Sequence, residues 1–153
     1  MDSITTALTD LFAMPEYILE IGVQEGKTKR KQIQLGITNA QLMFIHEHGS
    51  PLRHLPARPV LQMTIDWAIS SNVVSNTWID CINDFFENND VSRIDQKMNK
   101  LALKLQNYAR MLIRDKKLAP NAASTIARKH SDTPLIDTGQ LSRAITCIAI
   151  RIK

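Results

Sequence analysis

Residues 135–139 read Leu-Ile-Asp-Thr-Gly, an order typical of the active-site loop of aspartic proteases. In those enzymes two such loops bring two carboxyl groups together to share one proton. Only 14 residues follow Gly139 in this chain of 153, too few to complete the barrel that holds the loop. We therefore interpret Asp137 as the N-cap of a helix, with Gln140 as its partner in a capping box.

Three of the four histidines lie close together in the sequence, and histidine is a common ligand of metal ions. His46 and His48 flank Glu47, and His54 follows them. Residues two apart on a helix point to different faces, and the chain has no His-Glu-x-x-His sequence. We expect a subunit or partner contact here rather than a metal site.

The sequence also lacks phosphate-loop, dinucleotide-binding and Gly-x-Ser-x-Gly motifs, so we expect no cofactor and no enzyme activity.

The composition is that of a folded globular protein, with 44% apolar and 22% charged residues. The length predicts a single domain over residues 1–153. No apolar run approaches the roughly 18 residues of a membrane span, and no basic region precedes an apolar one at the N-terminus. We expect a protein that is neither membrane-bound nor secreted.

Cys81 and Cys147 are isolated in the sequence and are expected to be buried, reduced thiols.

The net charge of +4 includes one basic cluster, formed by Lys27, Lys29, Arg30 and Lys31. Two interpretations of the cluster remain open. It is either a solvated turn between two strands, or a contact with DNA in a channel or with an acidic partner. Aromatic residues make up only 5% of the chain, which argues against a dedicated nucleic-acid reader.

The two ends of the chain are expected to supply the sheet. Residues 1–14 fit a short helix or arm that ends before Pro15. Residues 17–24 are rich in β-branched and aromatic side chains, and residues 32–36 can return as the second strand of a hairpin. Residues 147–152 alternate between two faces, which predicts a C-terminal strand that pairs with this hairpin.

A capping box opens the next predicted helix, because the hydroxyl of Thr38 can accept from the amide of Gln41 while the Gln41 side chain reaches back. We expect this helix to stop at Gly49, which can adopt the left-handed conformation that ends helices. Three prolines then fall within nine residues, the last being Pro59. They should hold the connector around Arg58 extended and stiff.

Apolar residues at helical spacing predict long helices in the middle of the chain. Residues 61–85 fit either one long helix or two kinked ones, with a polar interruption at residues 70–72. A narrow apolar seam then predicts a second long amphipathic helix. Such a seam packs either against a helix of the same domain or against another subunit. The seam consists of Ile94, Met98, Leu101, Leu105, Tyr108 and Leu112.

The fold class that follows is α+β. A small antiparallel sheet, made from the N-terminal hairpin and the C-terminal strand, is expected to pack with the long amphipathic helices.

Three blocks of the sequence, in this order and at these separations, resemble the tail-completion or neck proteins of tailed bacteriophages, often called virion morphogenesis proteins. That family usually has Phe where this chain has His48 and Val60, and a polar residue where it has Ala144. These departures affect packing more than role. The blocks are Asn-Ala-Gln-Leu-Met-Phe-Ile-His-Glu-His-Gly-Ser at 39–50, Leu-Pro-Ala-Arg-Pro-Val-Leu at 55–61 and Pro-Leu-Ile-Asp-Thr-Gly-Gln-Leu-Ser-Arg-Ala-Ile at 134–145.

The resemblance implies a non-enzymatic structural protein of the virion. It would form a homo-oligomeric ring, six-fold or twelve-fold related, around the DNA channel. The ring would join the head connector or head-closure proteins to the tail terminator or tail tube, and the chain would be in the host cytoplasm during assembly. We assign the subunit or partner interface to His46, Glu47, His48, Arg53, His54 and Arg58.

Two alternatives to a neck protein remain open at this point. One is a tail terminator or another protein associated with the tail tube. The other is a small basic nucleic-acid-binding module that uses the cluster between Lys27 and Lys31.

Overall fold

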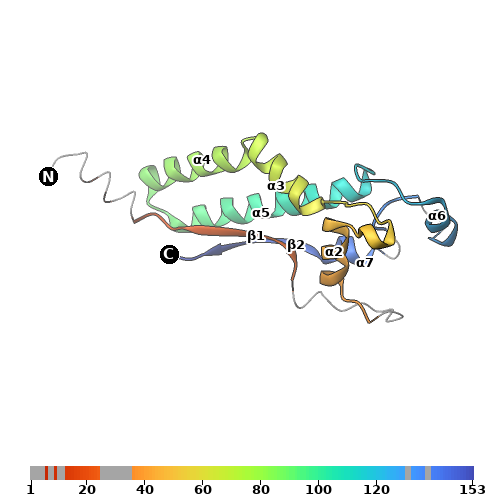
Figure 1. Cartoon of the computed structure of the whole chain (residues 1–153). Helices are drawn as coiled ribbons and strands as arrows, with labels where there is room; N and C mark the ends of the chain where they lie inside the picture. The colour runs from red at the N-terminus through yellow and green to blue at the C-terminus, as the bar shows by residue number, and fades with distance from the viewer. Residues whose placement is uncertain (1–5, 7–8, 10–12, 25–35, 130–131, 137–138) are drawn as a thin grey trace.

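The computed structural model describes residues 6, 9, 13–24, 36–129, 132–136 and 139–153, and it confirms the α+β class (Figure 1). A two-stranded sheet packs against long helices. Most of the predicted N-terminal arm, the basic cluster and Asp137 lie outside the described residues. In chain order the elements are β1 (Tyr17–Val23), α2 (Asn39–His48), the short 3-10 helix η2 (Pro51–Arg53), α3 (Val60–Ser70), α4 (Val73–Asn88), α5 (Val91–Arg114), α6 (Ala123–Lys129), α7 (Gln140–Ala144) and β2 (Ile145–Arg151).

The sheet joins the two ends of the chain. β1 and β2 pair antiparallel, with Tyr17 opposite Arg151 and Val23 opposite Ile145. The predicted pairing of the C-terminal strand with the N-terminal strand is therefore confirmed. The returning strand expected at residues 32–36 falls outside the described residues except for Gly36, which is not in a strand.

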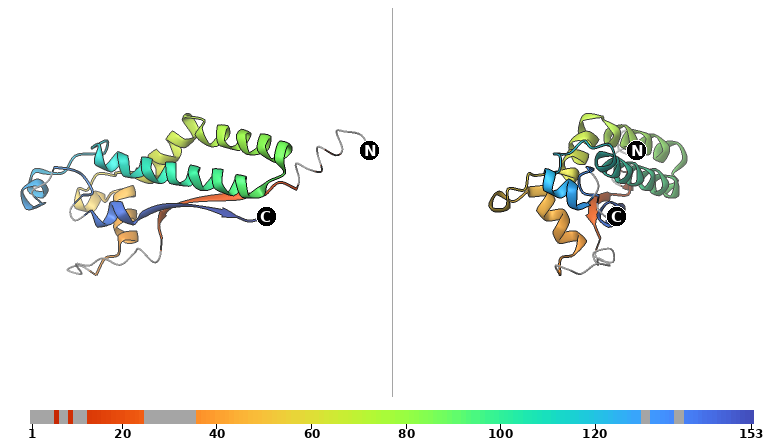
Figure 2. Two further views of the ribbon diagram at one scale, coloured as in Figure 1. Left: turned by 180° about the vertical axis from the view of Figure 1, so that it is seen from behind. Right: turned by 90° about the vertical axis from the view of Figure 1, so that its right-hand side faces the viewer.

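One face of the sheet is covered by helices. Leu19 and Ile21 of β1, with Cys147 of β2, pack into the same core as α4 and α5. Figure 2 shows both long helices on this side of the strands. Ile18 and Ile152 belong to the opposite face and are exposed.

The region predicted as one long helix or two kinked ones forms two helices, α3 and α4. They are separated at Ser71 and Asn72, and Asn72 has a φ of 55°. Asparagine tolerates this left-handed conformation better than most residues do. The chain turns there, so both helices can pack on α5.

The seam of α5 packs against other elements of the same domain. This was one of the two interpretations that the sequence left open, the other being contact with another subunit. Its aliphatic members are buried, from Ile94 near the start to Leu112 near the end. Tyr108 is half-buried and stacks on Trp67 of α3, with 3.9 Å between the ring centroids. The seam therefore joins α5 to α3, α4 and the sheet.

A polar network also holds the sheet on α5. The hydroxyl of Tyr17 donates to Asp95 Oδ1 at 2.6 Å, and Arg151 Nη1 lies 3.2 Å from Asp95 Oδ2. Burial and the bond to Asp95 raise the pKa of Tyr17. Because Tyr17 and Arg151 are opposite each other in the sheet, one carboxylate contacts both strands.

The start of α7 differs from the prediction. The helix begins at Gln140, and Gly139 at its N-cap has a φ of 70° and no side chain that could cap. Gln140 is thus the first helical residue, whereas a capping box needs it at the third position. The expected start was two residues too early, because the glycine turns the chain just before the helix.

We predict that raising the pH destabilises the fold through Cys147. Burial raises the pKa of this thiol to about 11, whereas an unfolded cysteine ionises near 8.5. Its stabilising contribution is complete below the unfolded pKa and is lost as the pH rises toward the folded one. Urea midpoints measured at neutral and alkaline pH should fall more for the native protein than for Cys147→Val. An equal fall in both proteins would contradict this prediction.

Candidate functional site

The candidate site is the connector between α2 and α3, and its geometry starts at the N-terminus of α2. Thr38 Oγ1 accepts from the Gln41 amide at 3.1 Å, and Gln41 Oε1 accepts from the Thr38 amide at 2.9 Å. The predicted capping box is confirmed. It fixes where α2 begins, and therefore which side chains the helix carries to the connector.

The helix ends at Gly49, as predicted, but in a different conformation. The Gly49 amide donates to Ile45 O at 2.8 Å, and its φ of 72° is positive while its ψ of −173° is extended. This is not the left-handed conformation that we expected. A Cβ here would lie 2.8 Å from both Ala57 N and Leu55 O, so the glycine allows the two arms of the connector to approach closely.

Backbone hydrogen bonds close the connector into a narrow loop. Ser50 N donates to Leu55 O at 2.9 Å, and Leu55 N donates to Ser50 O at 3.0 Å. Further along, Arg58 N donates to the carbonyl of His46 at 2.6 Å. The stiffness predicted from the prolines is thus reinforced by hydrogen bonds between the two arms.

Glu47 has a structural role that the sequence did not reveal. Its carboxylate accepts from the amides of Leu61 at 3.1 Å and Gln62 at 2.8 Å. These amides belong to the first turn of α3, where Pro59 provides no side-chain cap. An acidic group at a helix N-terminus satisfies free amides and is favoured by the helix dipole. Glu47 therefore caps α3, and the partner contact that we expected of it stays a prediction.

Arg58 also differs from its predicted role as an interface residue. Only 4% of it is exposed. Its Nε donates to Ala119 O at 2.7 Å, and its Nη2 donates to Pro120 O at 2.8 Å. Burial lowers the pKa of Arg58, but a guanidinium starts high enough to stay protonated. Through these two hydrogen bonds Arg58 holds the connector against the segment between α5 and α6, and it supplies donors to two backbone carbonyls of that segment.

The tip of the connector is exposed and available to a partner. Leu52 is 97% exposed, and its neighbours Arg53 and His54 are also exposed. Of the predicted interface residues, Arg53 and His54 at this tip stay candidates, as does the exposed His48 of α2, and Leu52 joins them. Sequence reasoning missed Leu52, although a leucine next to a proline and outside any helical or strand period was a usable signal.

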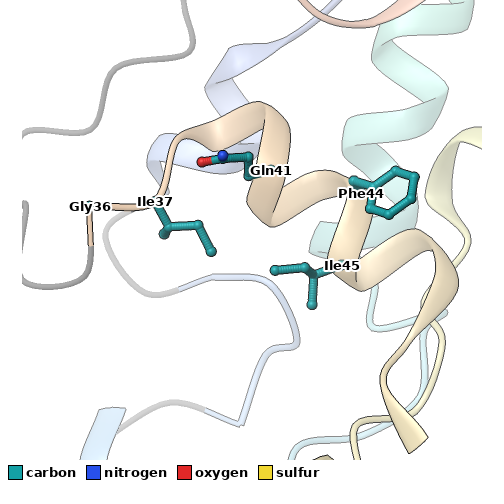
Figure 3. A pocket seen from close by; sticks show the side chains of 5 residues that line it. All are labelled: Gly36, Ile37, Gln41, Phe44 and Ile45. Carbon is teal, nitrogen blue, oxygen red and sulfur yellow. The ribbon is translucent and has the colours of Figure 1, made fainter.

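The outer side of α2 offers a second exposed surface. Phe44 is exposed and its ring lies 4.4 Å from that of His48, whose Nδ1 is 3.0 Å from Phe44 O. Beside them is a shallow hollow of about 390 Å³. Figure 3 shows the side chains of Ile37 and Ile45 facing each other across it. His46, two residues before His48, is half-buried, as expected for a different helix face.

The predicted site residues that the structure describes do not form a metal site. Within the described residues, no group of three or more His, Cys, Asp or Glu side chains is arranged to hold a metal ion. In the same part of the chain, no helix combines the length and the apolar character that crossing a membrane requires. The basic cluster from Lys27 to Lys31 is outside that part.

Comparison with protein-family models, with curated proteins and with solved structures finds no match to this chain. The resemblance to phage neck proteins therefore remains a prediction from three blocks of sequence. Two of those blocks, residues 39–50 and 55–61, flank the tip of the connector.

We predict that Arg58→Met lowers the free energy of unfolding by about 3 kcal/mol, because the carbonyls of Ala119 and Pro120 lose the charged donors of a buried side chain. Arg53→Met is the matched control, since the same side chain is removed from an exposed position five residues away. It should change the free energy by less than about 0.5 kcal/mol. Urea denaturation followed by circular dichroism measures both. Equal effects of the two variants would mean that Arg58 is not the structural anchor.

We also predict that Gly49→Ala destabilises the protein by about 3 kcal/mol, through the unfavourable backbone conformation and the contacts that a Cβ would make. At Gly22 a Cβ would meet nothing within 4 Å, so Gly22→Ala is the control and should stay within about 0.5 kcal/mol of the native protein. Thermal unfolding of both variants tests the difference. A tolerated alanine at position 49 would show that the two arms can separate.

Proposed function

We propose that this chain is a non-enzymatic structural protein of a tailed-phage virion, which forms a ring at the head–tail junction and joins the head connector to the tail around the DNA channel. The observation that carries the proposal is the stiff connector that presents Leu52 at its tip, 97% exposed. The flanking sequence blocks resemble those of neck proteins, and this resemblance suggests the head–tail junction as the place where the tip docks.

A rigid apolar tip is well suited to docking. Burying a leucine side chain contributes about 1.5–3 kcal/mol, and a pre-formed loop loses little conformational entropy when it binds. Gly49 and the paired Ser50 and Leu55 fix the base of the loop. The exposed Arg53 and His54 add polar contacts at its rim, where guanidinium groups are favoured.

The sheet supports assembly with further copies. It has only two strands among the described residues, so β1 and β2 each leave one edge without a strand neighbour there. Unpaired amides and carbonyls on such an edge can accept a strand from another chain. A homo-oligomeric ring built on this domain is compatible with that geometry.

A tail terminator is the alternative within the same assembly, and particle morphology separates the two functions. Disrupting the gene of a neck protein should yield filled heads and separate tails of uniform length in negative-stain electron micrographs. A terminator would instead give tails of irregular length, because growth of the tube would not be stopped. Intact virions, or a complete lack of heads, would contradict the proposed function.

At residue level, we predict that Leu52→Asp abolishes joining of heads to tails without lowering stability. The side chain is exposed in the free chain, so unfolding should be unaffected, while docking would bury a charge. The measurement is complementation of the disrupted gene, scored by the fraction of joined particles and the infectious titre.

Two control variants accompany that experiment. Leu52→Met keeps an apolar tip and should complement, and Ser124→Asp adds the same charge to an exposed position of α6 and should complement as well. If Leu52→Asp joined heads to tails as well as these controls do, the tip would not be the docking site.

A further inference from the structure

The two longest helices carry opposite charges. α4 contains three acidic residues and no Lys or Arg, and α5 contains a single acidic residue, Asp95, among its cations. Figure 1 shows the two helices side by side. The acidic residues of α4 are Asp80, Asp84 and Glu87, and the cations of α5 are Arg93, Lys97, Lys100, Lys104, Arg110 and Arg114.

Part of this charge is paired inside the domain. Asp84 Oδ2 lies 2.7 Å from Lys97 Nζ, and its Oδ1 is 3.8 Å from Arg93 Nη1. The acidic helix and the basic helix of one chain therefore already attract each other where they touch. The same attraction is available to charges that point away from this contact.

Each of the two helices also carries a pair of exposed charged residues. Asp80 and Glu87 on α4, and Lys100 and Lys104 on α5, all lie on the surface. None of the four forms a salt bridge with a described residue. Positions seven apart on one helix, or four apart, lie on the same side, so each pair marks one face.

Large apolar side chains flank each of these charged stripes. On α4, Ile79 is 54% exposed and Phe86 is 48% exposed. Each is next in sequence to one of the two carboxylates and points about 100° away from it, so the two apolar side chains lie along the flank of the acidic stripe. On α5, Leu103 is 53% exposed and lies between the two lysines. We call these surfaces the acidic α4 face and the basic α5 face. Each consists of a stripe of one sign of charge with exposed apolar side chains beside it, and both can contribute to helix packing.

We propose that the acidic α4 face of one copy packs against the basic α5 face of the next copy, and that repetition of this contact builds the ring on which the proposed function rests. The two faces differ and belong to the same chain, so a pair of copies still offers one free face of each kind. Such a head-to-tail contact continues until rotation closes the ring.

The charge distribution favours a second copy over DNA as the occupant of the basic α5 face. The neighbouring helix α4 is acidic, and its carboxylates would repel a phosphate backbone lying along the helix pair. Leu103 would also gain nothing from contact with phosphates, whereas Ile79 and Phe86 of a second copy could bury it. DNA binding is therefore an outcome to be tested and not part of the proposal.

The test is a charge swap in the full-length chain. One variant reverses the acidic α4 face with Asp80→Lys and Glu87→Lys, and the other reverses the basic α5 face with Lys100→Glu and Lys104→Glu. Each variant alone should self-associate at least about tenfold more weakly than the native chain, because like charges then meet. An equimolar mixture of the two should recover association, since each reversed face meets a complementary one. Sedimentation velocity and native mass spectrometry measure the oligomers.

Controls exclude changes in folding and in net charge. Lys117→Glu with Lys153→Glu changes the net charge as much as the α5 reversal does, but outside the basic α5 face, and should associate like the native chain. Urea midpoints establish that every variant is folded. Association of the native chain should also weaken between about 0.1 M and about 1 M salt, over which the screening length falls from about 10 Å to about 3 Å.

Several results would overturn the inference. These are a native chain that stays monomeric at high micromolar concentration in low salt, reversed variants that associate normally, or a mixture that shows no recovery. A monomeric native chain that binds random-sequence duplex DNA, and loses this binding on Lys100→Glu with Lys104→Glu, would make the basic α5 face a nucleic-acid surface instead.

Failure of this inference can be told apart from failure of the proposed function. If the native gene restores joining of heads to tails and both charge-reversed variants restore it equally well, the neck role stands and the α4–α5 contact falls. If disruption of the gene leaves virions intact, the neck role falls whatever the self-association of the purified chain.

Discussion

The buried side of α5 is the constraint on which the rest of the structure depends. Both strands contact this helix, and so do α3, α4 and α7. A two-stranded sheet is only marginally stable by itself, and helices gain most of their stability from packing an apolar face. Each fully buried aliphatic side chain of the seam contributes about 1.5–3 kcal/mol. The buried side of α5 provides the packing that the fold needs. The outward side of the helix can therefore carry charged residues without loss of stability.

The parts of the fold that the sequence predicted correctly are those with a local or periodic cause. The seam of α5 repeats at helical spacing, the capping box joins Thr38 and Gln41, which are three positions apart, and the C-terminal strand alternates between two faces. These patterns depend on neighbouring residues only. The pairing of the two chain ends could also be inferred, since few other segments had strand character.

The candidate site was predicted less well, because its residues act over long sequence separations. Arg58 reaches carbonyls at residues 119 and 120, and Glu47 caps a helix that starts thirteen residues later. Nothing in their own neighbourhood distinguishes such residues from exposed charges. The prolines correctly indicated a stiff connector, but they did not show which of its side chains is exposed. At α7 the glycine had more influence on the start of the helix than the capping pattern did.

The way in which the connector is held has a mechanical consequence. Its base is fixed in three ways: the carboxylate of Glu47 joins α2 to α3, the guanidinium of Arg58 binds the segment after α5, and the Arg58 amide binds the backbone of α2. These attachments act in parallel, so a pull on Leu52 is shared among them and none carries the whole load. Tension applied at the tip would therefore pass into the helical body of the domain, and the loop would yield only when several bonds break together.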